Sequence, residues 1–219
     1  MYPIIKLVAA CILANSIALA VTNDVSRLAS AVDYKYNHIS TLQSDFTEIY
    51  RGSGSDRTET GALWLKKPGK MRWEYRSPKE KLFVSDGRDV WFYVPGDRQV
   101  ERSKLKKVED LRSPVGFLLG QTKLEKELRG LSDAPDLTPL ESGDRVLRGV
   151  PQAMADRVSG VVLEITPENW IRRILIEEVD GSVTDFRFNN QRANIDIPED
   201  RFRFSPPPGV VIVDGQLGQ

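Results

Sequence analysis

The first apolar positions after the N-terminal segment follow the spacing of a helix. They recur every three or four residues, with polar residues between them, at Val25, Leu28, Val32, Tyr36 and Ile39. Such a stripe is typical of an amphipathic helix that covers an apolar surface. Asn23 and Asp24 precede it, and both residue types are favoured at helix N-caps. The sequence therefore predicts a helix over residues 25–39.

After residue 44 the spacing of apolar positions shortens to two, which is the period of a strand with one buried face. The clearest case is the alternation of Met71, Trp73 and Tyr75 with charged residues, which is a half-buried strand pattern. Pairs such as Pro68-Gly69 and Asp86-Gly87 mark turns between successive runs. The pattern predicts an antiparallel meander with strands over residues 44–50, 61–66, 71–75, 82–84 and 90–94.

A second helical pattern follows the meander. Its apolar side carries Leu105, Val108 and Leu111. Ser113-Pro114 then begins a short apolar helix, residues 115–119, because proline is favoured at the first helical position. Both helical segments need an apolar surface to cover, and one side of a curved sheet could supply it.

Strand patterns return in the second half of the chain. They are weak near Thr138 and Val146 and clearer over residues 161–166, 171–179 and 183–188. We find no internal repeat and no linker, so we expect a single domain over residues 21–219. Its tail, residues 211–219, follows a proline run and is rich in glycine, which predicts a loose end.

Residues 1–20 have the organisation of a secretory signal peptide. They contain a basic residue, an apolar run over residues 7–17 and a small-residue cleavage site at Ala18-Leu19-Ala20. The run is shorter than the roughly 20 residues that span a bilayer. A lipoprotein signal ending at Cys11 is the competing interpretation, but it leaves too short a hydrophobic stretch before the cysteine. We expect cleavage after residue 20, export to the periplasm and a mature chain without cysteine.

Charge and composition argue against several functional classes. Lysine and arginine number 31, as do aspartate and glutamate, so no polyanionic partner such as nucleic acid is expected. The single histidine, His38, has no second imidazole with which to bind zinc and no serine-elbow motif as a partner. Glu177 and Glu178 are adjacent on a predicted strand and would point to opposite faces. We therefore expect a non-enzymatic protein with no metal and no cofactor.

Aromatic residues are concentrated in the meander. Within about thirty residues they include Trp64, Trp73, Phe83, Trp91, Phe92 and Tyr93. Ordinary core packing explains any one ring. Periodicity leaves open whether the space between the sheet and its covering helices is filled.

Five blocks of the sequence carry a family resemblance. They are residues 62–75 (ALWLKKPGKMRWEY), residues 84–87 (VSDG), residues 90–93 (VWFY), Ser113-Pro114 with residues 117–119, and residues 202–210 (FRFSPPPGV). In this order they cover nearly all of the mature chain, and together they resemble the LolA-type outer-membrane lipoprotein carriers.

The resemblance implies an α+β fold, in which an unclosed, strongly curved antiparallel β-sheet (a half-barrel) carries a lid of short α-helices over an apolar cavity. It also implies a periplasmic lipoprotein chaperone, which accepts cargo from an inner-membrane ABC lipoprotein-release complex and passes it to an outer-membrane lipoprotein receptor. We expect this carrier to be a monomer.

The resemblance also assigns roles by position. Lys67 falls where the family usually has a lid-closing arginine, and lysine lacks the planar fork of that residue, so Arg72 is a second candidate. Met71 falls on a position usually held by an aromatic residue. The lid and the sheet together imply an acyl-binding set of Tyr36, Lys67, Met71, Arg72, Trp73, Phe83, Trp91, Phe117 and Leu118.

Two other functions stay open at this point. The same cavity could carry other lipids, such as glycolipids, and the sequence does not separate these cargo classes. A related half-barrel could also act as a periplasmic sensor that binds a protein partner, although such proteins usually have an added domain.

Overall fold

The computed structural model describes residues 24–52, 54–105, 118 and 123–215 of the chain. The strands are β1 (Thr41–Gly52), β2 (Ser55–Lys66), β3 (Lys70–Ser77), β4 (Lys81–Asp86), β5 (Asp89–Tyr93), β6 (Gln99–Lys104), β7 (Leu128–Asp133), β8 (Arg145–Pro151), β9 (Val158–Ile165), β10 (Ile171–Glu178), β11 (Val183–Ala193) and β12 (Val211–Asp214). The helical elements are an N-terminal helix over residues 24–38, α3 (Leu124–Glu127), η2 (Gln152–Met154) and η3 (Glu199–Phe202).

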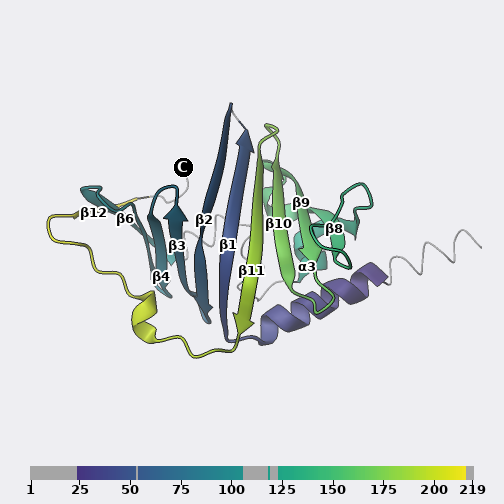
Figure 1. Ribbon diagram of the computed structural model, residues 1–219, viewed down its shortest axis with the longest axis horizontal. Coiled ribbons are helices and arrows are strands. Elements are labelled where there is room, and N and C mark those ends of the chain that lie inside the picture. Colours follow the sequence, from purple (N-terminus) through teal and green to yellow (C-terminus); the bar gives the residue numbers. More distant parts are fainter. Residues whose placement is uncertain (1–23, 53, 106–117, 119–122, 216–219) are drawn as a thin grey trace, which may run out of the picture.

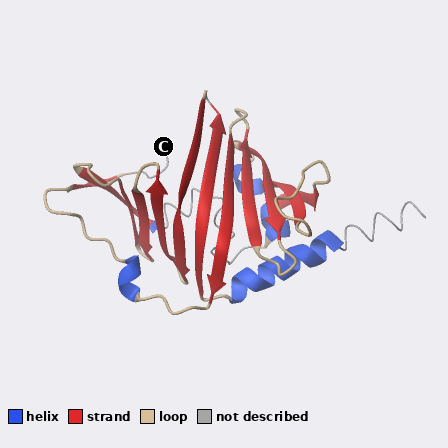
Figure 2. Cartoon of the chain, viewed as in Figure 1, coloured by secondary structure: helices blue, strands red, loops and turns tan. Residues whose placement is uncertain are grey.

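All twelve strands belong to one curved sheet, in the order β12-β6-β5-β4-β3-β2-β1-β11-β10-β9-β8-β7 (Figures 1 and 2). Neighbouring strands are antiparallel, apart from the parallel pair β12 and β6. The strands at the two ends of this order, β12 and β7, are not paired with each other. The sheet is therefore unclosed, as the resemblance implied.

The N-terminal helix confirms the first prediction from the sequence, since it spans residues 24–38 instead of 25–39. It lies along the lower end of β11, β10 and β9 in the view of Figure 1. Its apolar stripe is buried at Val25, Ala29, Val32 and Tyr36 and joins the main hydrophobic core. Within the described part of the chain, no helix is long and apolar enough to cross a membrane.

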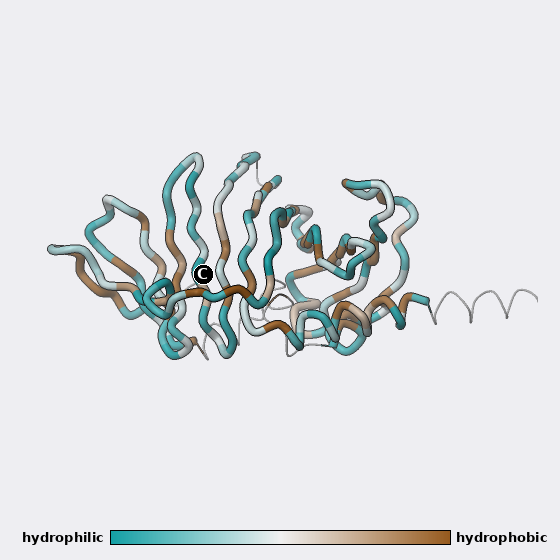
Figure 3. Tube along the Cα trace, turned by 60° about the horizontal axis from the view of Figure 1, so that its bottom comes forward, coloured by the Kyte–Doolittle hydropathy of each residue, from teal (hydrophilic) through white to brown (hydrophobic). Residues whose placement is uncertain are grey.

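Alternating burial along the strands divides the sheet into two faces, and Figure 3 shows hydrophobic and hydrophilic stretches along the chain. We call the face that the N-terminal helix covers the inner face. There Leu63, Trp73, Phe83 and Phe92 lie opposite one another in register across β2 to β5, and all belong to or pack against the main core. The main core therefore lies between the inner face and the helix.

The opposite, outer face has smaller hydrophobic clusters of its own. Ala62 and Trp64 of β2 pack there with Ile197 and Phe202 of the C-terminal segment. Arg201 lies over the Trp64 ring, 4.6 Å from its centroid. The segment after β11 therefore crosses back over the outer face and covers its apolar residues.

Glu199 attaches this C-terminal segment to the sheet through two salt bridges. Its carboxylate forms one salt bridge with Lys66, at 2.7 Å, and another with Lys70. Hydrogen bonds from these two ammonium groups lower the pKa of Glu199 to about 2. The segment is thus attached at both ends of η3, by the ion pairs of Glu199 and by the packing of Phe202.

Two expectations from the sequence differ from the structure. The predicted loose tail, residues 211–219, contains β12, which pairs with β6 from Val211 to Asp214. Its Val-Ile-Val run suits a strand, and the edge of β6 offers unpaired backbone groups to it. The predicted strand near Thr138 is also wrong, because Thr138 lies in a loop and the strand begins at Arg145. The predicted helices over residues 105–119 lie outside the described residues, apart from Leu105 and Leu118.

One glycine permits the close packing of the inner face. A Cβ atom on Gly61 would lie 1.9 Å from the Glu74 carbonyl oxygen and 2.8 Å from the ring of Phe46. We expect Gly61→Ala to lower the free energy of unfolding by about 2–3 kcal/mol, because the strand or the ring must shift. Chemical denaturation measures this change. The neighbouring, exposed Thr60→Ala is the control, with an expected change of about 0.5 kcal/mol, and equal effects would contradict the packing argument.

The ion pairs of Glu199 predict an acid-dependent contribution to stability. Because the pKa of Glu199 is lowered in the folded chain, its charge stabilises the fold above its ordinary pKa of about 4.5, and this contribution is lost as the pH falls toward 2. Glu199→Gln should therefore melt slightly below the parent protein at neutral pH and approach it near pH 2. The effect is small because the side chain is half exposed. Thermal melts across this pH range test it, and a difference that does not change with pH would contradict it.

Candidate functional site

The inner face carries a continuous cluster of aromatic rings. Phe46 of β1 lies 4.9 Å from Trp73 and 5.0 Å from Tyr75, both of β3, between ring centroids. Trp73 also lies 6.0 Å from Phe186 and 6.4 Å from Phe188 of β11. These strands come from distant parts of the sequence, but β11, β1, β2 and β3 are neighbours in the sheet. The fold therefore joins separate aromatic residues into one surface.

The edge of this cluster remains partly accessible. Trp73 is 7% exposed, whereas several rings packed against the core are only partly buried, at Tyr75, Phe83, Phe92, Trp170 and Phe186. Half-buried aromatic residues grouped on one face are typical of a surface that binds an apolar partner. The group therefore makes the inner face the main candidate for a binding site.

Tyr36 connects the N-terminal helix to the sheet. It is 2% exposed, and its hydroxyl accepts a hydrogen bond from the backbone N–H of Ile171 at 3.0 Å. The same hydroxyl donates to Oε1 of Gln191 at 3.1 Å, and the Gln191 amide donates to the Ile171 carbonyl at 2.9 Å. Burial raises the pKa of Tyr36, so the phenol stays protonated and keeps its donor. The helix is thus positioned by a polar contact inside an apolar core.

Lys67 makes a further polar contact with Tyr36, through the Tyr36 backbone. It lies in the turn between β2 and β3, and its Nζ atom donates a hydrogen bond to the backbone carbonyl of Tyr36. That carbonyl belongs to the last turn of the helix, where carbonyls lack partners within the helix and a positive charge is favourable. Partial burial lowers the pKa of Lys67. The bond links the C-terminal end of the helix to the β2–β3 turn.

A third contact joins the helix to the chain beyond β6. The carboxylate of Asp33 accepts hydrogen bonds from the backbone N–H of Leu124, at 3.1 and 3.2 Å. Leu124 is the first residue of α3, and its apolar side chain is buried in the main core. Burial is the main cause that raises the pKa of Asp33. The helix is therefore fixed by side-chain contacts to the β2–β3 turn, to β10 with β11 and to α3, and Asp24 at its start adds an ion pair with Arg145 of β8 at 2.6 Å.

The structure brings together most, but not all, of the residues expected to bind acyl chains. Those in or against the main core are Tyr36, Met71, Trp73, Phe83 and Leu118. Lys67 contacts the helix backbone, and Phe117 lies outside the described residues.

Arg72 and Trp91 lie on the outer face instead. Arg72 donates hydrogen bonds to Glu74 at 2.5 Å and to the carbonyl of Arg201 at 3.2 Å. The Trp91 ring lies 5.6 Å from that of Phe204. Both residues therefore contact the C-terminal segment, on the side of the sheet away from the N-terminal helix.

Other members of the inner aromatic cluster were not identified from the sequence. Phe46, Phe186 and Phe188 come from β1 and β11, which pair across about 140 residues of sequence. A local signal did exist for Phe92, because the Asp86-Gly87 turn sets the β4–β5 register that places Phe92 opposite Phe83. The same register puts Trp91 opposite Val84, on the other face.

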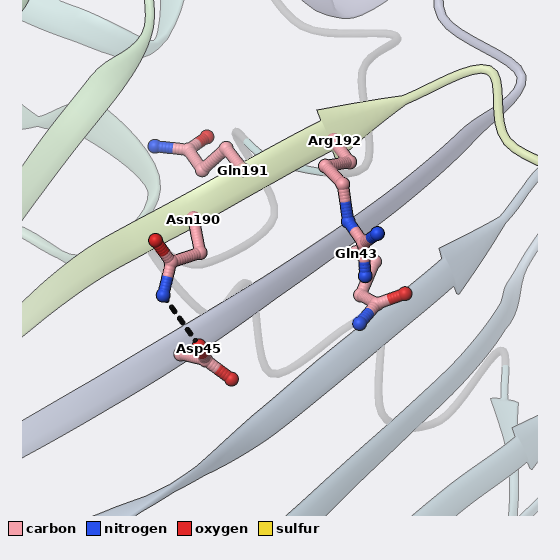
Figure 4. A pocket seen from close by; sticks show the side chains of 5 residues that line it. All are labelled: Gln43, Asp45, Asn190, Gln191 and Arg192. Carbon is pink, nitrogen blue, oxygen red and sulfur yellow. Dashed lines mark hydrogen bonds between the residues drawn. The ribbon is translucent and has the colours of Figure 1, made fainter.

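A polar hollow of about 460 Å³ lies over β1 and β11 (Figure 4). Its lining consists of Gln43, Asp45, Asn190, Gln191 and Arg192. The β1–β11 register shifts between Gln43 and Asp45, and Asn190 donates a hydrogen bond to Asp45 at 2.8 Å. Amide and charged groups are a poor lining for hydrocarbon. This hollow is therefore a weaker candidate than the inner face for an apolar ligand.

Catalytic and metal chemistry find little support in the described part of the chain. There, no group of three or more histidine, cysteine, aspartate or glutamate residues could hold a metal ion. His38 stacks on Tyr34 with 4.0 Å between ring centroids, and its Nδ1 atom lies 2.7 Å from the Tyr34 carbonyl. These contacts are those of a residue at the end of a helix. The described arrangement of the inner face suits the binding of an apolar ligand.

Comparison with solved structures agrees with the fold. The crystal structure of MucB matches with a TM-score of 0.52 and 15% identity, over 84% of this chain and 63% of that one. At this identity the likeness concerns the fold alone. A LolA superfamily protein from Nitrosomonas europaea, NE2245, matches with a TM-score of 0.45 and 12% identity, over 81% of this chain and 96% of that one.

Sequence comparison is more specific. The outer-membrane lipoprotein carrier protein of Nitrosospira multiformis is 31% identical over 175 residues, which are 79% of this chain and 82% of that protein. The protein of the same name from Chromobacterium violaceum is 31% identical over 209 residues, 95% of this chain and 96% of that protein. A family model described as outer membrane lipoprotein carrier protein LolA matches residues 37–205. The chain therefore belongs to the LolA family of outer membrane lipoprotein carrier proteins.

Proposed function

We propose that this protein is a periplasmic carrier that binds the acyl chains of lipoproteins against its inner face. The observation that carries the proposal is the group of half-buried aromatic rings on that face, beside a helix held to the sheet by a few polar contacts. The names of the relatives support lipoproteins as the cargo. The signal-like segment over residues 1–20 supports export.

The physical requirement for such a carrier is simple. Each methylene kept out of water is worth about 0.8 kcal/mol, so an acylated protein does not cross an aqueous compartment with its chains exposed. Apolar walls bind hydrocarbon without directional bonds and therefore tolerate different chain lengths. The rings around Trp73 and Phe186, 6.0 Å apart, provide such a wall.

Release requires that the covering element can move. The N-terminal helix contacts the sheet through a large apolar stripe, but few hydrogen bonds fix its position. Opening the contacts of Tyr36 and Lys67, together with those of Asp24 and Asp33, would free the helix from the inner face without breaking any strand pairing. We propose that this helix acts as a lid over the acyl chains, with Lys67 as the residue that closes it.

We also propose the direction of transfer. The carrier receives lipoproteins from an inner-membrane ABC release complex and passes them to an outer-membrane receptor. Family membership supports this route. A carrier that binds through apolar contacts alone needs no chemical step of its own, since differences in affinity between successive binding sites determine the direction of transfer.

The first test compares adjacent residues that face opposite sides of the sheet. Phe92 lies on the inner face, whereas the Tyr93 ring lies 5.7 Å from Phe204 on the outer face. Phe92→Ser should weaken the binding of a fluorescent fatty-acyl probe about tenfold, because one apolar contact of roughly 1.5 kcal/mol is lost. Tyr93→Ser should change the dissociation constant less than twofold. Fluorescence titration measures both, and absence of probe binding to the parent protein would sink the carrier proposal.

The second test addresses the closing contact of the helix. Lys67→Met removes the bond to the Tyr36 carbonyl and should raise the probe's dissociation rate about fivefold, which corresponds to about 1 kcal/mol. Lys67→Arg keeps a donor and the charge and should restore the parent rate or slow it. Stopped-flow displacement gives these rates. The lid role fails if Lys67→Met releases the probe at the parent rate while circular dichroism shows an unchanged fold.

A further inference from the structure

The inner face becomes polar toward the β1–β2 hairpin. The next inward position on β1 after Phe46 is Glu48, two residues and about 7 Å further along the strand. Glu48 lies opposite Glu59 of β2. Beside them, Tyr75 of β3 lies opposite Lys81 of β4. We call Glu48, Glu59, Tyr75 and Lys81, together with Arg57, the polar row.

The members of the polar row are connected by short hydrogen bonds. The Tyr75 hydroxyl donates to Oε2 of Glu48 at 2.7 Å. The Lys81 ammonium donates to Oε2 of Glu59 at 2.6 Å and lies 4.3 Å from the Tyr75 ring centroid. Arg57 donates to the same Glu59 oxygen at 3.1 Å. Each carboxylate thus has a donor from a neighbouring side chain.

Burial within the polar row is uneven. The side chains of Glu48 and Glu59 are 11% and 4% exposed, whereas those of Lys81 and Arg57 are 21% and 49% exposed. Burial is the main cause that raises the pKa of Glu48, and the neighbouring Glu59 adds to it. The two carboxylates are therefore more buried than the two cations, which are partly exposed to solvent.

Such a group is not needed to bind hydrocarbon. Two facing carboxylates in a partly buried place are costly, and apolar residues of similar size could continue the aromatic wall. What the polar row adds is a pair of anchored cations at the end of that wall. A lysine ammonium has three N–H donors and an arginine guanidinium five, so both can donate to a ligand while they bind Glu59.

An acyl chain likewise has an apolar part and a polar part. Its hydrocarbon part suits the rings of Phe46 and Trp73, but at its root an ester or amide carbonyl needs a hydrogen-bond donor when it is removed from water. We propose that the polar row binds the carbonyl groups at the roots of the cargo's acyl chains. The chains then lie along the inner face with their methyl ends toward the N-terminal helix. This inference rests on the proposed carrier function and adds the orientation of the cargo.

The test uses two probes that differ in this carbonyl chemistry. N-phenyl-1-naphthylamine is apolar and has no carbonyl, whereas a synthetic triacylated lipopeptide has ester and amide carbonyls. We expect Lys81→Met to weaken lipopeptide binding five- to tenfold, measured by displacement of N-phenyl-1-naphthylamine, and to leave the affinity for N-phenyl-1-naphthylamine itself within twofold. Lys81→Arg should restore lipopeptide binding.

Controls separate this inference from other effects. Lys70→Met removes an ion pair with Glu199 on the outer face and should affect neither probe. The double variant Lys81→Gln/Glu59→Gln removes both charges and keeps a hydrogen-bonding pair, so it should fold even if Lys81→Met does not, and it should bind the lipopeptide as weakly as expected for Lys81→Met. Equal affinity of the parent and this double variant for the lipopeptide would overturn the inference. Failure of the parent protein to bind either probe would instead overturn the carrier function.

Discussion

The contact between the N-terminal helix and the inner face is the interaction on which the rest of this structure depends. A single sheet with an apolar face must have that face covered, and the described part of the chain contains no second sheet to supply a partner. Within the described residues the N-terminal amphipathic helix covers part of this face, and Tyr36 positions it. Its hydroxyl bonds to Ile171 and Gln191, and its carbonyl accepts the bond from Lys67. One residue therefore connects the helix to β10, β11 and the β2–β3 turn.

The two faces of the sheet are covered in different ways, and this difference has a functional consequence. On the outer face the C-terminal segment is continuous with β11 and is held by Glu199 and by ring contacts such as that of Phe204 with Trp91. On the inner face several rings stay half-buried. The outer cover is therefore held by ion pairs and ring contacts, whereas the inner cover packs through the apolar stripe of the helix. The proposed lid motion of the helix would expose the inner rings and leave the strand pairing and the outer cover in place.

Local patterns in the sequence were sufficient for the N-terminal helix and for β1 to β5, but not for β6. Their signals lie within a few residues, as in the alternation of Met71 and Trp73. The inner aromatic cluster could not be predicted in the same way, because Phe46 and Phe188 meet only through the pairing of β1 with β11. Trp91 shows the related difficulty of register, since a shift of one residue exchanges the faces of a strand. Arg72, which alternates with Met71, lies on the outer face for the same reason.

The roles of Lys67 and Lys81 illustrate why charge on an apolar face has to be interpreted from its partners. Both lysines adjoin the inner face, yet Lys67 donates to a helix carbonyl, whereas Lys81 donates to a buried carboxylate. The first contact disappears if the helix moves away, so Lys67 can respond to opening. The second joins β4 to β2 within the sheet and does not involve the helix. These partners fit the two proposed roles, in which Lys81 orients the ligand and Lys67 holds the helix closed.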